Sequence, residues 1–328
     1  MLMSNHPSVS ILIPNFNGHD LLSRNLPSVL TCSNQYPGIS EVIVIDDAST
    51  EERFEEIKSS FKTVIFLQHE TNKGFSEAIN TGVKAAVGEL IFLLNSDVSP
   101  GSTSVTELVA FFHQKDIFSV SPLIVDENNN PNDYSWNLRA FAWGKLSRQK
   151  WDLMTAKKLA ETDQLPTLYS SGGSMMARKE MFQALQGFDP IFYPFYYEDQ
   201  DLGARAWKRG WRSLFNPKVT VEHQRKGSIQ SEIPSWRIKL MQRRNSLIFD
   251  WIHLGILRLL LSRSPQYLKQ IFTRTLIGDW KFLLAFLLAL SLLPKIVFRR
   301  FSNSSSRRYD HVVQQINQEV ARLKASLK

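Results

Sequence analysis

Short apolar runs recur along the first hundred residues of the chain. Each is four or five residues long and consists mostly of Val, Ile, Leu or Phe; they cover residues 9–13, 41–45, 64–67 and 90–94. A run without polar alternation is typical of a strand that is buried on both faces, as in a parallel sheet. We therefore predict parallel strands at these four places.

The residues between the third and fourth runs show the period of a helix. Apolar and small side chains fall on one face of a helix predicted from 76 to 87, which Gly88 should end; they are Ala78, Ile79, Gly82, Val83 and Ala86. Because strands and helices alternate, the pattern predicts an α/β fold with a doubly wound, mostly parallel sheet.

Polar residues follow three of the predicted strands. Asn15 comes after the first strand, Asp46 and Asp47 end the second, and Asp97 lies just beyond the fourth. Ligands of such sheets bind beyond the carboxyl ends of the strands, so these side chains are candidates for one shared site. The alternative is that they only cap helices and form turns.

Residues 126–168 show neither a helical nor a strand period. The segment opens with a run of Asp, Glu and Asn, and Trp136, Trp143 and Trp151 follow among basic residues. We interpret it as a long irregular excursion, which is either functional or a surface insertion with packing of its own.

Charge is distributed unevenly over the 328 residues. Residues 237–308 contain 14 Lys and Arg against Asp250 and Asp279, a balance of +12, which leaves −4 for the rest of the chain. The anionic partner of the basic segment, a membrane or a nucleic acid, is therefore separate from the chemistry. Cys32 is the only cysteine, so an intramolecular disulfide is excluded. The first residues lack the charged and apolar regions of a signal peptide, so we expect the catalytic part in the cytosol.

Three acidic residues stand within four positions, directly after two tyrosines. They are Glu198, Asp199 and Asp201, and Asp201 should pair with Arg205 one helical turn later. A carboxylate can act as a base that takes the proton of a hydroxyl, and clustered acids raise one another's pKa. The alternative is that the acids only open a helix, where they stabilise its dipole.

A metal site is predicted after the fourth strand. Asn95-Ser96-Asp97 offers a carboxylate to magnesium or manganese, which prefer oxygen ligands and bridge phosphates. His223 ends a second β-like run and is either a further ligand or a structural histidine.

Eight short motifs occur in order between residues 8 and 225. They are Val-Ser-Ile-Leu-Ile-Pro-Asn-Phe-Asn, Val-Ile-Asp-Asp-Ala-Ser-Thr, Asn72-Lys73-Gly74-Phe75 with Asn80 and Gly82, Leu-Leu-Asn-Ser-Asp, Gly172-Gly173-Ser-Met-Met-Ala-Arg178, Gly187-Phe188-Asp189, Tyr-Glu-Asp-Gln-Asp-Leu and His223. Together they resemble glycosyltransferase family 2, in particular its rhamnosyltransferase-like branch of bacterial envelope polysaccharide enzymes. The resemblance implies a GT-A domain and an inverting transfer from a nucleotide-diphosphate sugar.

The resemblance also assigns roles to residues. The nucleotide sugar would be bound near Pro14, Asn15, Asn17, Asp46, Asp47, Asn72, Lys73, Asn95, Ser96 and Asp97. Asp199 would be the base, and Asp97 would hold the divalent metal with help from His223. The acceptor or the acidic motif would be supported by Gly172, Gly173, Tyr197, Glu198 and Asp201. Asn95 departs from the family's DxD motif, which leaves the metal with a neutral ligand or one ligand fewer.

The basic segment 237–301 is expected to be helical and to lie on the cytoplasmic face of the membrane without spanning it. Residues 282–293 are apolar, but Lys281 and Lys295 interrupt the longer run. Trp251 and Trp280 would lie at the interface, with headgroups contacted by Arg243, Arg244, Arg258, Arg299 and Arg300. A buried helical subdomain and a spanning helix are the alternatives.

Three regions result: a GT-A domain over 1–236, the membrane-associating segment over 237–301, and a linker with a short amphipathic helix over 302–328. The linker covers residues 302–306. One stripe of the helix carries Val313, Ile316, Val320, Leu323 and Leu327 and is compatible with a homo-oligomer.

The resemblance suggests dTDP-rhamnose as donor, with a UDP-hexose or UDP-galactofuranose as rivals, and a saccharide or polyprenyl-diphosphate-linked acceptor. A nucleic-acid-binding protein is an alternative, but it leaves the acidic cluster unexplained and needs a more polar basic face, so no nucleic acid is expected. A nucleotidyltransferase would need a basic loop after the first strand, whereas Pro-Asn-Phe-Asn-Gly-His-Asp has no Lys or Arg. An inactive nucleotide-sugar-binding homologue is suggested only by Asn95.

Overall fold

The computed structural model describes residues 6–50, 53–224, 233–302 and 307–327. Within these residues the main sheet has the strand order β3-β2-β1-β4-β10-β6-β11-β5, and β9 pairs with β11. The strands are β1 (Val9–Asn15), β2 (Ser40–Asp46), β3 (Ile65–Gln68), β4 (Leu90–Leu94), β5 (Val98–Pro100), β6 (Ile117–Val125), β9 (Leu165–Thr167), β10 (Ser174–Arg178) and β11 (Arg212–His223). The four predicted strands are confirmed as β1 to β4, and they pair in parallel.

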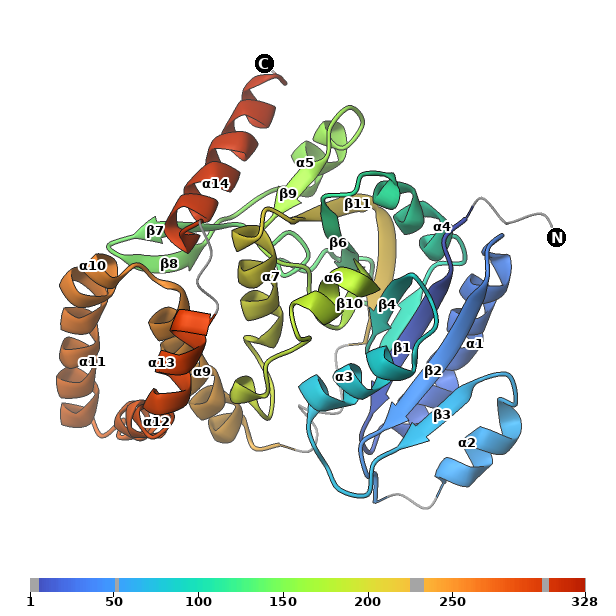
Figure 1. Cartoon of the computed structure of the whole chain (residues 1–328), viewed down its shortest axis with the longest axis horizontal. Coiled ribbons are helices and arrows are strands. Elements are labelled where there is room, and N and C mark those ends of the chain that lie inside the picture. Colours follow the sequence, from blue (N-terminus) through green and yellow to red (C-terminus); the bar gives the residue numbers. More distant parts are fainter. Residues whose placement is uncertain (1–5, 51–52, 225–232, 303–306, 328) are drawn as a thin grey trace.

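Helices cover both faces of this sheet and extend it at one end (Figure 1). They are α1 (His19–Gln35), α2 (Phe54–Ser60), α3 (Phe75–Ala85), α4 (Ser104–Val109), α5 (Leu153–Leu159), α6 (Lys179–Ala184), α7 (Glu198–Lys208), α9 (Ser235–His253), α10 (Ile256–Arg258), α11 (Ser264–Leu276), α12 (Lys281–Leu290), α13 (Leu293–Ser302) and α14 (Tyr309–Ala325). The predicted helix at 76–87 is α3. It ends earlier than expected, and Gly88 packs against β1, where an added Cβ would lie 2.5 Å from the Ser10 amide nitrogen.

Alternate residues of the strands enter two different hydrophobic cores. Ile11 and Phe92 pack with α1 and α4 on one face. Leu12 and Ile43 pack with α3, α6 and α7 on the other. Burial on both faces explains why the strands are continuous apolar runs, and it confirms the predicted layered α/β fold.

The carboxyl ends of β1, β2 and β4 lie at one edge of the sheet. Asn15 and Asp46 are partners in the parallel register of β1 and β2, and β4 pairs with the other side of β1. The strand order thus brings the polar residues that follow these strands to one place, as expected.

The segment 126–168 is more regular than predicted. It holds a two-stranded hairpin of β7 (Arg139–Ala142) and β8 (Lys145–Arg148), followed by α5 and β9. Trp136 is fully buried and stacks on Phe215 of β11, and Trp151 packs beside both rings. The tryptophans make this an insertion with its own packing, whereas Trp143 at the hairpin tip is almost fully exposed.

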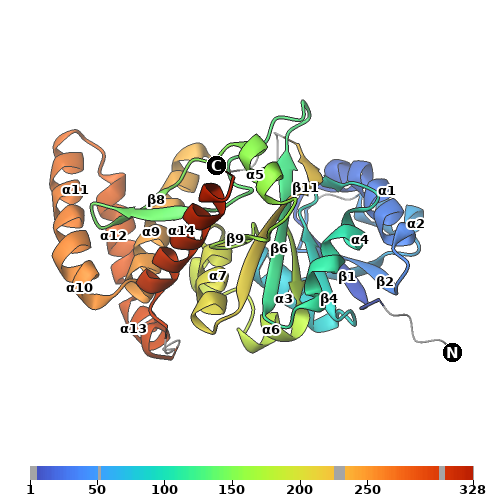
Figure 2. The same ribbon diagram turned by 90° about the horizontal axis from the view of Figure 1, so that it is seen from above.

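The C-terminal helices pack onto the sheet domain. A third core joins α9, α12, α13 and α14 to β11 and the insertion. Figures 1 and 2 show α9 to α13 at the end of the molecule far from α1 and α2, with α14 returning across α7. Contacts therefore cross the predicted boundary at 236, while the predicted linker falls mostly on residues 303–306, outside the described residues.

Two predictions for these helices are wrong. The five arginines expected at headgroups bind within the protein instead: Arg243 to Asp279, Arg244 to the Tyr193 carbonyl, Arg258 to Asp310, Arg299 to Asp189, and Arg300 to the Trp251 and Leu254 carbonyls. Trp251, expected at an interface, packs edge-to-face on Phe286. The apolar stripe of α14 is also buried within the chain, with Val313 and Ile316 each 1% exposed, so it offers no surface to a second copy.

No single described helix is long and apolar enough to cross a bilayer; α12 and α13 reach that length and composition only together, with a bend of 60° between them.

Candidate active site

Asp97 and His223 meet at the end of β4. His223 is the last residue of β11 and pairs with Val98 of β5 in antiparallel register, which brings its ring to Asp97. The distance from His223 Nε2 to Asp97 Oδ2 is 3.5 Å. Asp97 Oδ1 is buried and has no hydrogen-bond partner among the described residues. Burial raises the pKa of Asp97, and the nearby His223 partly opposes this.

This pair fits part of a metal site. The orphaned carboxylate oxygen and the imidazole nitrogen are both suitable ligands for a divalent cation. In the described part of the chain, no third His, Cys, Asp or Glu side chain joins them. A metal held here would therefore take its remaining ligands from a bound diphosphate or from water.

Asn95 is held against the Gly172-Gly173 turn. The backbone N–H of Asn95 donates to the Gly173 carbonyl at 2.9 Å, and a Cβ on Gly173 would lie only 2.7 Å from Asn95 Nδ2. The preceding residue of this turn, Gly172, donates its backbone N–H to Asp199 Oδ2 at 3.4 Å. The Gly172-Gly173 dipeptide thus connects the end of β4, where the candidate metal pair lies, with the acidic motif.

The acidic motif begins α7 after an unusual turn. Tyr196 and Tyr197 have φ of 71° and 79°, a left-handed conformation that bulky residues adopt only when their surroundings impose it. The turn aims Asp199 at Gly172, and it buries Glu198. Tyr197, expected to support the acceptor or the acidic motif, packs toward Phe249.

The three acids have different environments. Burial raises the pKa of Asp199 to about 6, although hydrogen bonds from the amides of Gln200 and Gly172 oppose it. Burial and the neighbouring Asp199 raise the pKa of Glu198 well above its ordinary value. Asp201 contradicts the expectation that all three are raised. Burial would raise its pKa, but Arg205 and His253 outweigh burial and hold it at about 2.

Asp201 is therefore a permanent carboxylate in a buried ion-pair network. Arg205 contacts it at 2.6 Å, which confirms the predicted pair, and His253 of α9 lies 2.8 Å away. Asp199 is the acid of this motif whose pKa suits a base near neutral pH.

Asn245 of α9 also belongs to the site, although its position in the sequence did not predict this. This residue is fully buried, and its Nδ2 group donates to three carbonyls of the turn before α7, those of Phe192, Phe195 and Tyr196, at 2.8, 3.0 and 2.9 Å. Nothing in its local sequence distinguishes it, because its role depends on backbone atoms about 50 positions earlier.

A second missed residue is Arg139 of β7. Its positive charge lies near enough to Asp199 to favour the ionised carboxylate, and its Nη2 donates to the Tyr169 hydroxyl at 2.8 Å. The hairpin of the insertion thus supplies a cation beside the candidate base.

The loops after β1 and β2 are tied together by Asp46. It accepts hydrogen bonds from Asn15 Nδ2 at 2.9 Å and from the Ser49 hydroxyl at 2.6 Å. The same hydroxyl accepts from the Asn17 amide at 2.9 Å. Asp46 is fully buried, so it shapes this edge rather than presenting a free carboxylate.

Asp47 has a corresponding role for residues 72–74. It accepts from the amides of Lys73 and Gly74 at 2.9 and 2.7 Å, and His69 Nδ1 lies 2.7 Å away. The Asn72 and Lys73 side chains remain exposed at the same edge.

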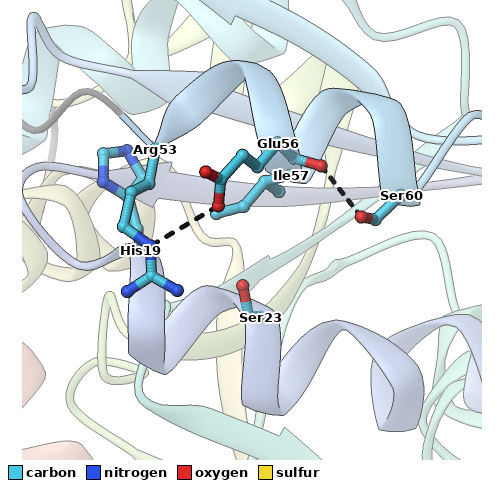
Figure 3. A pocket seen from close by; sticks show the side chains of 6 residues that line it. All are labelled: His19, Ser23, Arg53, Glu56, Ile57 and Ser60. Carbon is cyan, nitrogen blue, oxygen red and sulfur yellow. Dashed lines mark hydrogen bonds and ion pairs between the residues drawn. The ribbon is translucent and has the colours of Figure 1, made fainter.

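The remaining expected residues line this edge. Pro14, the last residue but one of β1, pairs with Ile45 of β2 and is half-buried. Ser96 is buried, and its carbonyl accepts from Asn25 of α1 at 2.8 Å. A separate cavity of about 200 Å³ lies between α1 and α2 and contains His19 and Arg53 but none of the expected residues (Figure 3).

The site combines a mixed sheet with a polar edge, a candidate metal pair and a buried acidic helix start. These features define this chain as a glycosyltransferase of the GT-A fold, and comparison with known proteins agrees. Residues 10–186 match Glycosyl transferase family 2, and the chain belongs to that family.

The relatives include an N-acetylglucosaminyl-diphospho-decaprenol L-rhamnosyltransferase of Mycobacterium tuberculosis. It is 25% identical over 205 residues, which are 56% of this chain and 66% of that enzyme. The chain thus spans just under two thirds of that relative's length.

Solved structures share the fold. GalNAc-T7 with UDP, GalNAc and Mn2+ superposes with a TM-score of 0.60 at 21% identity, covering 77% of this chain and 49% of that one. S. aureus TarS 1-349 in complex with UDP superposes with a TM-score of 0.52 at 16% identity, covering 95% and 92%.

Proposed function

We propose that this enzyme transfers a sugar from a nucleotide-diphosphate donor to a hydroxyl with inversion at the anomeric carbon, and that Asp199 is the base. The observation that carries the proposal is the Gly172-Gly173 turn, whose two residues bond to Asp199 and Asn95 respectively. A donor bound at the strand edge would then have its anomeric carbon next to the base.

Asp199 would act on the acceptor. As the acceptor oxygen attacks the anomeric carbon, its proton passes to the Asp199 carboxylate. The bond from that carbon to the diphosphate oxygen breaks on the opposite side, which inverts the configuration. The pKa of about 6 keeps Asp199 ionised at neutral pH while leaving it basic enough to take the proton.

Asp97 and His223 would hold a divalent metal, magnesium or manganese, against the donor diphosphate. When bound, the metal neutralises the negative charge that develops on the leaving diphosphate. The orphaned Asp97 oxygen supports this assignment, and the Mn2+ in the structure of GalNAc-T7 agrees with it. The backbone N–H of Asn95 is hydrogen-bonded to Gly173. Its side-chain oxygen Oδ1 is buried and has no hydrogen-bond partner among the described residues.

The proposed donor is dTDP-rhamnose and the proposed acceptor a saccharide on a polyprenyl diphosphate. The relative from M. tuberculosis, named as a rhamnosyltransferase with a lipid-diphosphate substrate, supports both. A UDP-hexose or UDP-galactofuranose is the rival donor. Exposed Lys73 at the strand edge would contact the diphosphate of either.

A panel of nucleotide sugars tests the donor. With Mn2+ present, the true donor at about 100 times its dissociation constant should stabilise the fold by about 2.7 kcal/mol in thermal or chemical unfolding. Stabilisation by a UDP-sugar and not by dTDP-rhamnose would select the rival. No stabilisation by any nucleotide sugar would contradict the proposed function.

A further inference from the structure

Exposed apolar side chains gather on the C-terminal helices. The described residues include 23 large hydrophobic side chains that are exposed, and 15 of them lie between Ile256 and Phe301. This stretch is about a seventh of the chain, so the enrichment is several-fold. A contiguous apolar surface of this kind marks an interaction site in a folded protein.

The largest part of this surface follows α10, the π-helical turn Leu259–Arg263 and α11. Leu257, Leu261, Leu268, Phe272 and Leu276 are 65–75% exposed and recur at intervals close to whole turns, so they form one stripe. We call this stripe the apolar end face. Figures 1 and 2 agree that α10 and α11 form the end of the molecule opposite the N-terminal strands.

The hairpin of the insertion adds a tryptophan beside this face. Gln266 of α11 donates to the Trp143 carbonyl, and Gly144 approaches Ser262 so closely that an added Cβ would lie 2.3 Å from the Ser262 Cβ. The Trp143 side chain is nevertheless 94% exposed. A fully exposed indole next to an exposed leucine stripe is typical of a membrane-interface anchor.

The net positive charge of the C-terminal helices indicates which partner binds the apolar end face. Residues 256–302 carry eight Lys and Arg against the single acid Asp279, which is paired with Arg243 and Arg274. Lys269 and Lys295 are exposed and Lys281 is half-buried, and none of the three has an ion pair within the described chain. A second copy would bring the same positive charge to the contact, and a nucleic acid would not cover leucines. An anionic lipid surface matches both features.

We propose that the apolar end face, together with Trp143 and these lysines, inserts into the surface of an anionic membrane without crossing it. The membrane side would be the cytoplasmic one, where nucleotide sugars are available.

The face is rigidly connected to the active site. Arg263, just before α11, and Tyr267 of α11 both bind the buried Asp250 of α9, at 2.6 Å each. The same helix α9 holds the turn before Asp199 through Asn245. Docking of the face would therefore fix the orientation of the base relative to the bilayer. This last step rests on the proposed lipid-linked acceptor, whereas membrane binding itself does not.

Flotation of the full-length protein with vesicles tests the proposal. Vesicles of phosphatidylcholine containing about one third phosphatidylglycerol should carry the protein upward at low salt, and pure phosphatidylcholine should carry much less. The combined change Leu257→Ser, Leu261→Ser and Phe272→Ser should reduce partition at least about tenfold. The matched control changes three exposed side chains elsewhere, Ile39, Val87 and Met154, to Ser and should float as the wild type does.

A second variant separates charge from burial. Replacing Lys269, Lys281 and Lys295 by Gln should remove most of the preference for anionic vesicles, about fivefold per lysine. Activity on a soluble acceptor should be unchanged in both variants, which distinguishes a failure of docking from a failure of the proposed reaction.

Three outcomes would overturn the proposal. The wild type could stay with the dense fraction in anionic vesicles at low salt. The triple serine variant could float as well as the wild type. The wild type could be a dimer that the triple variant converts to a monomer without vesicle binding, which would assign the face to a second copy of the chain.

Discussion

His253 Nε2 lies 2.8 Å from Asp201 Oδ1, and both side chains are almost completely buried. Burial and the nearby Lys208 lower the pKa of His253 to about 4, so the ring is neutral and donates its Nε2 proton to the carboxylate. Its Nδ1 accepts from Lys208 Nζ at 3.0 Å. These contacts join α9 to α7, the helix that carries Asp199, and both helices lie beyond the residues matched by the family.

Loss of the Asp201 charge should destabilise the fold. Asp201→Asn leaves Arg205 buried without its counter-ion, so the free energy of unfolding should fall by about 3–5 kcal/mol at pH 7. The matched control is Asp116→Asn, which breaks the more exposed pair with Arg212 and should cost about 1 kcal/mol or less. Urea denaturation of both variants measures this. Equal stability of the two variants would show that the network contributes little.

Turnover should depend on pH through Asp199. The base acts only when ionised, so kcat/KM should fall about tenfold per unit below about pH 6 and be level above it. A rate that is flat from pH 5 to 8 would exclude Asp199 as the titrating base.

The free energy of unfolding should also depend on pH through Asp199, but it should fall as the pH rises. Because burial raises the pKa of Asp199, its contribution is complete below the unfolded value of 3.8 and is lost as the pH rises through about 6. Asp199→Asn should therefore be more stable than the wild type at pH 8, by about 1–2 kcal/mol, and not at pH 4.

The layered fold could be predicted because its signal is local. The four runs that became β1 to β4 are apolar on both faces, and Leu12 and Ile11 illustrate this by entering different cores. From the residues alone His223 could be either a ligand or a structural histidine, and the family resemblance favoured its pairing with Asp97, from which 126 positions separate it.

The roles of the C-terminal helices could not be predicted in the same way. Arg299 and Arg258 were assigned to lipid headgroups because they stand among leucines, but their partners Asp189 and Asp310 are distant in sequence. Asn245 likewise acts on carbonyls that only the folded chain brings to it.

Asn245 should position the acidic motif. Asn245→Ala leaves three buried carbonyls without their donor and relaxes the left-handed turn at Tyr196, so kcat should fall about 10–100-fold with little change in donor KM. The pH at half-maximal kcat/KM should shift as well, because the burial of Asp199 changes.

The control for Asn245 is Asn80→Ala. Asn80 also makes two hydrogen bonds to the backbone, both to Phe188, but not to the acidic turn. It should lose stability without the shift in the pH profile. Identical pH profiles for both variants would reduce Asn245 to a purely structural role.

Metal and nucleotide should bind together, because Asp97 and His223 provide only two side-chain ligands among the described residues. Calorimetry should show weak binding of Mn2+ alone and tighter binding with dTDP or UDP present. Asp97→Asn should weaken the joint binding by at least about tenfold, the scale of losing a partner at a metal site. Glu222→Gln, the neighbouring exposed residue on β11, is the control. Equal nucleotide affinity with Mn2+ and with chelator would exclude this metal site.

The most direct test of the central claim compares Asp199→Asn with Glu198→Gln in release of nucleoside diphosphate from the selected donor in the presence of acceptor. Burial and the neighbouring Asp199 raise the pKa of Glu198 and so favour its neutral form, which Gln resembles, so Glu198→Gln should keep most of the turnover. Asp199→Asn should lose about 10²–10⁴-fold in kcat while binding the donor normally. Wild-type turnover in Asp199→Asn, or a larger loss in Glu198→Gln, would contradict the assignment of Asp199 as the base of this glycosyltransferase.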